Sequence, residues 1–377
     1  MTKTNSNQHF APQGLQRNRI TPMRTCDSSR KRRHFTLLLV GVACLLPAIG
    51  LQAASLTIVT DPNATDTPLF LQLLGINNAG TIVGYTGMGT PNPNRGFILT
   101  VPNSFTALNP NLTGGFLNSQ TQVFGINGAG NTTDGFVIDT NGVTHGFVDV
   151  GNGPTATAVD NPGTVTDPAV MNQLLGLNQN GTEAAGFYAD GADVDFGYTY
   201  DVGTHTFTAL NVPSSLGFVA GDNVMGTGVN NSSMVTGFFT NGAGVSFGFL
   251  LSGGIYSLID VPGGISTQPL SINDLGQIVG TYVGADGLNH GFIDTGGHFS
   301  TFDGVPGAPM NLIQGINDTE QIVGFATVDN IGTTVGFTGT VPEPATLLCS
   351  GLGILVGLAM RFRSRITRRM EIARAGR

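Results

Sequence analysis

Cysteine and tryptophan are missing from the part of the chain where a folded body is expected. The three cysteines, Cys26, Cys44 and Cys349, lie in the terminal segments, and residues 55–340 contain none. Disulfides, thiol catalysis and thiolate zinc sites are therefore excluded from that region. There is no tryptophan, whereas 56 glycines and a regular placement of Phe, Ile and Val favour a turn-rich, folded β protein over a disordered one.

Positive charge is also nearly absent from the middle of the chain. Of the 16 lysines and arginines, all but Arg95 lie at or before Arg33 or at or after Arg361. Residues 55–340 hold 21 Asp and Glu against that single arginine, which gives 1 − 21 = −20. Such a body repels phosphate backbones, so nucleic-acid binding is not expected, and cations are its more natural small partners. The same repulsion predicts a monomer at low salt.

The N-terminal segment has the order of a secretory signal. A basic run at residues 30–33 precedes an apolar stretch at residues 35–49 and then small residues, which predicts cleavage after Ala53 or Ala54. Residues 1–54 are thus read as a signal peptide with a long basic n-region. The true start is either Met1 or Met23. The alternative is an uncleaved N-terminal anchor, for which the apolar run is short.

The C-terminal segment, residues 341–377, has three parts. Pro342, Glu343 and Pro344 stop the preceding strand and begin an extended linker. Residues 345–360 carry no charge and predict a short transmembrane helix. Its anchoring side chains are Leu347, Leu348, Leu352, Ile354, Leu355, Val356 and Leu358. An arginine cluster that the positive-inside rule keeps cytoplasmic follows at Arg361, Arg363, Arg365, Arg368 and Arg369.

This three-part tail resembles the PEP-CTERM sorting signal, with Pro342, Glu343 and Pro344 at the motif positions. The resemblance implies export, anchoring in the inner membrane through the C-terminal helix, and processing near the motif by an exosortase in bacteria that make exopolysaccharide. The mature protein is then expected at the cell surface or in the extracellular matrix. The alternative is an ordinary tail anchor that follows a Pro-Glu-Pro sequence.

Residues 55–340 contain six copies of one pattern. Each copy opens on an apolar residue followed by asparagine, and the asparagines are Asn77, Asn127, Asn178, Asn230, Asn273 and Asn317. Gly followed usually by an aromatic residue recurs seven or eight residues later, and again eighteen or nineteen residues after the asparagine. In the first copy these pairs are Gly84-Tyr85 and Gly96-Phe97. Repeats of this length predict one supersecondary unit per copy.

Each copy is interpreted as a four-stranded meander. In the first copy we expect strands ending at Asn77, at 81–85, at 96–100 and at 104–108, with a turn of positive φ at 78–80. Four short strands per repeat predict an all-β, six-bladed β-propeller, while a β-solenoid or open array is the alternative. The last copy lacks a fourth strand, and residues 56–62 resemble the fourth strand at 256–262. An N-terminal strand is therefore expected to complete the last blade.

The repeats also resemble extracellular HAF-type repeats, most closely at His145-Gly146-Phe147 and His290-Gly291-Phe292. Glycine replaces alanine in every copy, and four copies lack the histidine. The resemblance therefore implies an extracellular repeat protein but no histidine that every repeat needs.

Candidate chemistry is sparse in the body. The histidines at equivalent positions, His145 and His290, fall in different repeats, so a shared catalytic site is not expected. The densest acidic loop contains Asp190, Asp193 and Asp195, which suits Ca²⁺, or is simply a solvated hairpin. No other cofactor is expected. We therefore predict a non-enzymatic binding or structural protein whose partners are extracellular polysaccharide or surface proteins, in addition to the secretion machinery and exosortase. The alternative is a polysaccharide-acting hydrolase or lyase on a propeller scaffold.

Overall fold

The computed structural model describes residues 56–61, 68–87, 93–100, 104–114, 118–163 and 169–342. The predicted signal peptide, transmembrane helix and arginine cluster lie outside these residues, as do Glu343 and Pro344. The part of the chain that the structure describes contains no helix long and apolar enough to cross a membrane.

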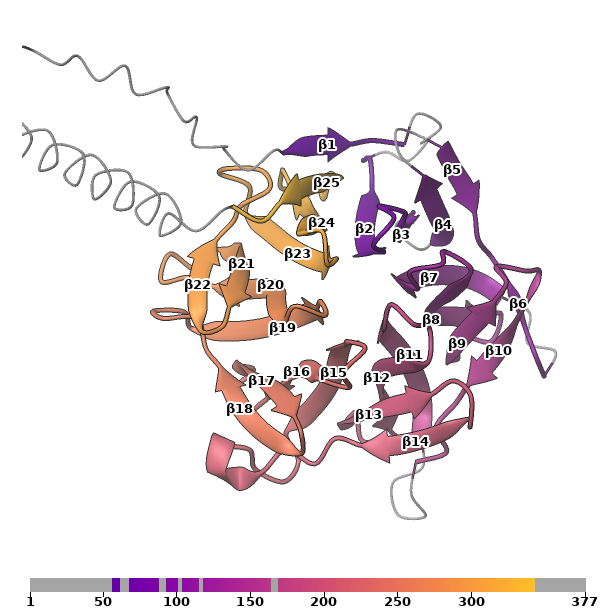
Figure 1. Ribbon diagram of the computed structural model, residues 1–377, viewed down its shortest axis with the longest axis horizontal. Helices are drawn as coiled ribbons and strands as arrows, with labels where there is room; N and C mark the ends of the chain where they lie inside the picture. The colour runs from indigo at the N-terminus through magenta and orange to yellow at the C-terminus, as the bar shows by residue number, and fades with distance from the viewer. Residues whose placement is uncertain are drawn as a thin grey trace, which may run out of the picture. The chain divides into compact units, whose positions relative to one another are not determined.

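The described residues form β-strands and one short 3₁₀ helix, arranged as sheets around a ring (Figure 1). The first repeat forms β2 (Leu71–Ile76), β3 (Ile82–Thr86), β4 (Arg95–Thr100) and β5 (Ser104–Ala107). The second forms β7 (Asn118–Ile126), β8 (Thr132–Asp139), β9 (Thr144–Val150) and β10 (Thr155–Val159), to which β6 (Asn111–Leu112) adds a parallel edge. The predicted strands of the first repeat are thus confirmed to within one residue at their ends.

The later repeats follow the same order. The third forms β11 (Ala169–Leu177), β12 (Glu183–Asp190), β13 (Asp195–Asp201) and β14 (Thr206–Ala209), and η1 (Ser214–Leu216) follows. The fourth forms β15 (Asn223–Val229), β16 (Val235–Thr240), β17 (Ser246–Ser252) and β18 (Ile255–Ile259). The fifth forms β19 (Ser266–Ile272), β20 (Gln277–Val283), β21 (Asn289–Thr295) and β22 (His298–Thr301). The sixth forms β23 (Met310–Ile316), β24 (Gln321–Thr327) and β25 (Thr334–Thr340).

The predicted closing strand is present. β1 (Thr57–Val59) pairs antiparallel with β25, with Ile58 opposite Phe337. The N-terminal strand therefore completes the sheet of the last repeat and covers the edge that β25 would otherwise leave open.

The expectation of six separate four-stranded sheets needs a correction. Hydrogen bonding groups the described strands into five sheets, of which four each hold one repeat and form four separate blades. The remaining eight strands, from β1 and the last two repeats, form a single sheet. The two repeats are joined there by one parallel pair, Asn289 with Met310, because β23 begins beside the start of β21. The arrangement is all-β and propeller-like.

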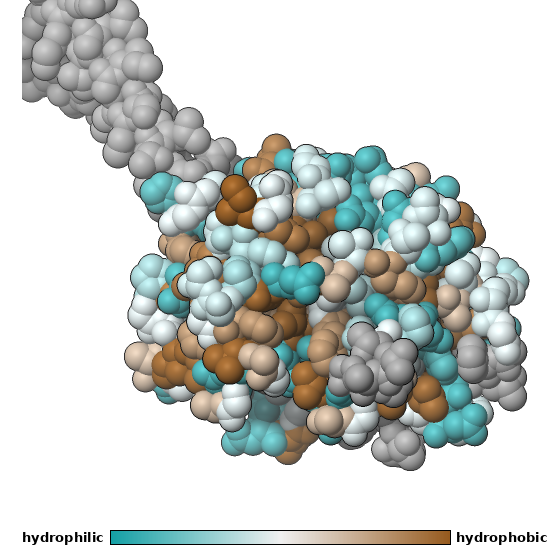
Figure 2. All heavy atoms as spheres, turned by 90° about the horizontal axis from the view of Figure 1, so that it is seen from below, coloured by the Kyte–Doolittle hydropathy of each residue, from teal (hydrophilic) through white to brown (hydrophobic). Residues whose placement is uncertain are grey.

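The recurrent aromatic residue of the third strand in each repeat forms the core between sheets. Phe147, Phe249, Phe292 and Phe337 have no exposed surface, and Tyr198 and Phe97 are almost as deeply buried. Burying one such ring contributes roughly 1.5–3 kcal/mol. Viewed edge-on, the ring shows hydrophobic side chains interspersed with hydrophilic ones (Figure 2).

The recurrent glycines lie at two kinds of close approach. A Cβ at Gly84 would clash with the main-chain oxygen of Gln72, which lies on the adjacent strand of the same sheet. A Cβ at Gly96 would instead lie 2.6 Å from Val123 Cγ2 in the next sheet. Only the second glycine of each pattern therefore serves contact between sheets.

Candidate functional site

The repeat asparagines form a ladder of hydrogen bonds at the inner end of each first strand. Asn77 is typical: its Oδ1 accepts hydrogen bonds from the main-chain nitrogens of Ala79 (3.1 Å) and Thr81 (2.8 Å), which fixes the turn after β2. Short polar side chains favour this local bonding. Asn77 and Asn317 are completely buried, so the sequence uses asparagine here as a buried turn-former.

In four of the six repeats the other end of the amide joins one repeat to the next, whereas Asn127 and Asn178 donate to Asn131 and Thr182 of their own turns. The Nδ2 atom of Asn77 donates to the main-chain oxygen of Asn127 at 2.9 Å. The same bond recurs from Asn230 to Asn273 at 3.0 Å and from Asn273 to Asn317 at 3.0 Å. Asn317 donates to Asn77 at 2.8 Å and thereby links the last repeat to the first. This hydrogen bond closes the ring at its inner edge. The pairing of β1 with β25 closes it at the outer edge.

The residues after the asparagines form a second tier of bonds. Asp318 Oδ1 accepts from the main-chain nitrogen of Asp274 at 2.7 Å, and Asp318 Oδ2 accepts from Asn78 Nδ2 at 2.6 Å. Asp274 accepts in the same way from the main-chain nitrogen of Asn231 at 2.7 Å. Asp274 and Asp318 thus bridge repeats.

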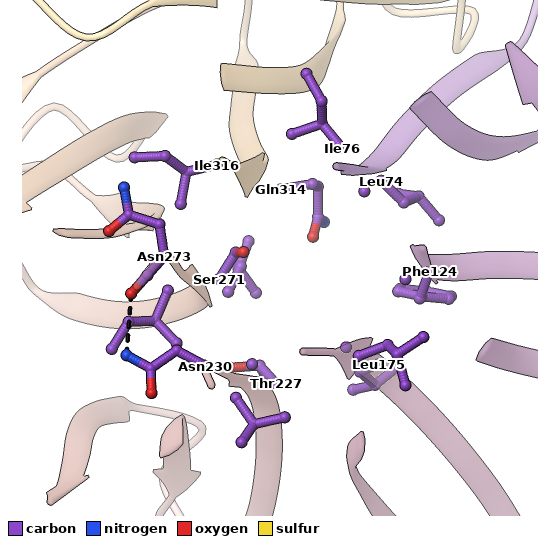
Figure 3. Close-up of a pocket in the computed structure, with 18 of the residues that line it drawn as sticks. Leu74, Ile76, Phe124, Leu175, Thr227, Asn230, Ser271, Asn273, Gln314 and Ile316 are labelled. Atoms are coloured by element: carbon purple, nitrogen blue, oxygen red, sulfur yellow. Dashed lines mark hydrogen bonds between the residues drawn. The ribbon is translucent and has the colours of Figure 1, made fainter. Parts of the chain in front are cut away.

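Every inner strand contains a β-bulge beside the central cavity, and Figure 3 shows side chains that line this cavity. In β2 the register shifts between Leu73 and Gly75, so Leu74 is the extra residue. The equivalent extra residues are Phe124, Leu175, Thr227, Leu270 and Gln314. All six line the central cavity. It has about 40 Å³ of space, enough for a few water molecules, and Asp274 is the one acidic residue in its lining.

A fully buried carboxylate lies behind the wall of this cavity. Asp134, on β8, is beside Gly125 and Gly176, whose main-chain nitrogens lower its pKa in part. Neither carboxylate oxygen has a partner in good hydrogen-bond geometry among the described residues. Burial dominates and raises the pKa of Asp134 to about 8, so the group is protonated at neutral pH.

The largest cleft lies at the side of the ring, between the third and fourth repeats. It encloses about 590 Å³, within the range of small-ligand sites. Its walls come from β12, β13, β15 and the connection through η1. Its ring-bearing lining residues are Tyr188, Phe196, Tyr198 and Phe218, and its acidic ones are Asp190, Asp195 and Asp222. Sequence reasoning missed the cleft as a site, although the longest spacing between repeat asparagines, from Asn178 to Asn230, marks the added connection.

The three aspartates of the predicted Ca²⁺ loop have different roles. Asp190 caps its own hairpin, since its Oδ1 accepts from the main-chain nitrogens of Ala192 (2.8 Å) and Val194 (3.0 Å). Asp193 is exposed and Asp195 is buried against the cleft. No group of three or more His, Cys, Asp or Glu among the described residues is placed to hold a metal ion. Asp190 Oδ1 therefore faces its own backbone, and Ca²⁺ binding at this loop stays a prediction.

The repeat histidines are separate, as the sequence indicated, and each contacts carboxylates of its own repeat. His145 Nδ1 lies 2.9 Å from Asp160 Oδ2. His290 lies 3.0 Å from Asp303 and 3.1 Å from Asp286. Burial lowers the pKa of His290, but the two carboxylates more than offset this and the pKa is raised.

Comparison with known proteins identifies the tail but not the body. No curated protein matches the chain. Similar solved structures include a putative TolB from Agrobacterium tumefaciens (12% identity, 77% of this chain and 98% of that chain, TM-score 0.47). They also include a sialidase from Trypanosoma rangeli (8%, 79% and 61%, TM-score 0.49) and AofleA from Arthrobotrys oligospora (11%, 77% and 84%, TM-score 0.43). These likenesses carry no information about activity.

A family profile described as the PEP-CTERM protein-sorting motif matches residues 340–364. The match begins at the last residue of β25, so the motif follows directly on the closed ring. It implies dependence on an exosortase and sorting to the surface. The resemblance of Pro342, Glu343 and Pro344 to this signal is thereby confirmed, and the chain carries a PEP-CTERM sorting motif at its C-terminal end.

Proposed function

We propose that this chain is an exported, surface-sorted, non-enzymatic protein of the bacterial envelope or exopolysaccharide matrix, whose acidic ring acts as a binding and structural module. The observation that carries the proposal is the sorting motif at residues 340–364, which follows the last strand of the ring. The predicted signal peptide at residues 1–54 directs export, and the predicted membrane helix at about residues 345–360 anchors the protein before processing. The resemblance of the repeats to HAF-type repeats is in keeping with an extracellular location.

We infer further that the eight-stranded sheet acts as two blades, so that the ring has six. A single parallel pair joins its two halves, whereas seven pairs join β24 to β25 within one half. The asparagine ladder also passes through both halves, from Asn230 to Asn273 and on to Asn317. Each half therefore has the internal bonding of a separate blade.

Replacing Pro342, Glu343 and Pro344 together by alanine tests the sorting step. In the native host we expect the wild-type ring to become accessible to protease added outside the cell, and the variant to stay with the membrane fraction. Equal surface exposure of both proteins would contradict exosortase-dependent sorting, while loss of both from the envelope would contradict the proposed location. The substitutions lie after the last strand, so the ring should fold in both proteins.

A polysaccharide-acting hydrolase or lyase is the second candidate, and one observation favours it. The side cleft combines several carboxylates with aromatic rings, and burial, with smaller contributions from Asp193 and Asp190, raises the pKa of Asp195 to about 6. A general acid in glycoside hydrolysis has such a raised pKa. Turnover of any member of a panel of glycans, lost in D195N, would favour the enzyme. Binding without turnover would favour the binding module.

A further inference from the structure

The side cleft has a wall of aromatic rings supplied by two repeats. The rings of Tyr188 and Phe196 stack with centroids 4.9 Å apart and an interplanar angle of 17°. Phe218 comes from the connection that contains η1, and its ring packs edge-on against Phe239 at 5.9 Å. The stacked pair and Phe218 both line the cleft, so a flat or ring-shaped group can pack against aromatic surface there.

The three carboxylates of the cleft differ in whether the protein already satisfies them. Asp190 accepts two main-chain hydrogen bonds from its own hairpin, and Asp222 Oδ2 accepts one from Val219 at 2.9 Å. The Asp195 carboxylate accepts none from the residues that the structure describes, yet Asp195 is only 8% exposed. Its oxygens are not among the described side-chain atoms that are sealed from solvent without a partner, so the carboxylate opens onto the cleft and can accept a hydrogen bond from a bound ligand.

The negative charge around Asp195 determines which kind of hydrogen-bond donor a ligand should carry. The cleft lining, as far as it is described, contains no Lys, Arg or His to balance its three aspartates. Asp190 and Asp193 act on Asp195 as further negative charges. An anionic polymer is therefore disfavoured. A neutral hydroxyl would satisfy one oxygen but leave the charge unbalanced, whereas an ammonium group supplies both a charge-assisted hydrogen bond and a counter-charge.

We propose that this cleft binds a protonated amine carried on a sugar-like ring, with the ammonium group on Asp195 and the ring against Tyr188, Phe196 and Phe218. The inference rests on the proposed role of the ring as a binding module and names its ligand class: a cationic amino sugar unit of an extracellular polymer. The volume of about 590 Å³ accommodates more than one sugar ring.

Calorimetric titration of the full chain in mild detergent tests this, with two oligosaccharides that differ in charge. The probes are the trimer of glucosamine and the trimer of N-acetylglucosamine, which has the same rings without the ammonium groups. We expect the charged trimer to bind at least ~10-fold more tightly than the neutral one, consistent with one charged contact of about 1.4 kcal/mol or more.

Two variants distinguish the effect of the Asp195 carboxylate from the effect of the overall negative charge of the loop. D195N should weaken binding of the charged trimer at least ~10-fold without lowering the melting temperature, because a buried charge with no internal donor does not stabilise the fold. D193N removes the same charge from the exposed end of the loop, at φ 61°, a conformation that asparagine tolerates well. It should leave the affinity within ~2-fold, well under the 1.4 kcal/mol that a tenfold change requires.

Three results would overturn the proposal: no binding of the charged trimer, equal binding of both trimers, or equal weakening by D195N and D193N. Equal binding of both trimers would indicate a site for neutral sugars. The proposed surface function has its own readout, because sorting depends on residues 340–364 and not on the cleft. A protein that is sorted normally but binds neither trimer would refute the ligand and leave the location intact.

Discussion

Replacing Asp134 by asparagine should change how the stability of the ring depends on pH. Asp134 is completely buried, and burial raises its pKa from 3.8 to about 8. Between these values the folded protein keeps a proton that the unfolded chain has released. The free energy of unfolding therefore falls by about 1.4 kcal/mol for each unit of rising pH.

The magnitude follows from the width of that window. Between about pH 5 and about pH 8 this one group should remove about 4 kcal/mol from the stability of the wild-type protein. Asparagine cannot ionise, so D134N lacks this slope. Other buried aspartates are present in both proteins and cancel in the difference.

Urea denaturation of the full chain in mild detergent at several pH values measures the effect. We expect the difference in free energy of unfolding, D134N minus wild type, to grow by about 4 kcal/mol from about pH 5 to about pH 8. D193N removes an exposed carboxylate, so its free energy of unfolding should change with pH in the same way as that of the wild type. If D134N also changed in the same way, Asp134 would not be the isolated, desolvated carboxyl group that its position implies.

Three further substitutions test the close packing of glycine, the closure of the ring and the contact between Asp303 and His290. Gly176→Ala should destabilise the protein by about 1–3 kcal/mol in urea, because its Cβ would lie 2.5 Å from a main-chain oxygen of the next inner strand. Asn317→Ala should cost about 1–3 kcal/mol, because it removes the bond that joins the last repeat to the first. Asp303→Asn should lower the pKa of His290 in an NMR titration. The contact between Asp303 and protonated His290 stabilises the fold fully below the ordinary histidine pKa. This stabilisation is lost as the pH rises through the raised pKa of His290 in the folded protein.

Matched controls show whether the reasoning is right. Gly242→Ala places its Cβ where nothing lies within 4 Å, so equal effects of the two alanines would refute the close approach at Gly176. Asn241 makes the same local turn as Asn317, with bonds to the nitrogens of Ala243 and Val245, but no bond between repeats is found for it among the described residues. Equal losses in N241A and N317A would show that ring closure contributes nothing. An unchanged His290 titration in D303N would contradict the pairing.

Much of the fold could be predicted because every repeat carries the same local sequence pattern. The asparagine and the two glycine–aromatic pairs recur at fixed spacing, and every one of them lies at an equivalent strand position. The closing strand was predictable for the same reason, since residues 56–62 have the pattern of a fourth strand. The fusion of the last two repeats into one sheet was not, because it depends on a single bridge between Asn289 and Met310.

The side cleft could not be predicted from the repeat pattern, because it lies where the pattern is interrupted. Phe218 and Asp222 belong to the connection between repeats, where no equivalent residue exists in the other copies. The burial of Asp195 depends on that connection, and its charge pattern in sequence is the same as that of a solvated hairpin. The acidic loop was therefore noticed, but Asp195 was read with Asp190 and Asp193 as a Ca²⁺ site or a solvated hairpin, and not as part of a cleft.

The most direct test of the account is the intact mass of the mature protein, purified from a host that has its exosortase and from one that lacks it. The account predicts that residues 1 to about 54 are absent in both, and that the residues beyond the Pro342 region are removed only when the exosortase is present. An unchanged C-terminus in both hosts would contradict surface sorting through this motif.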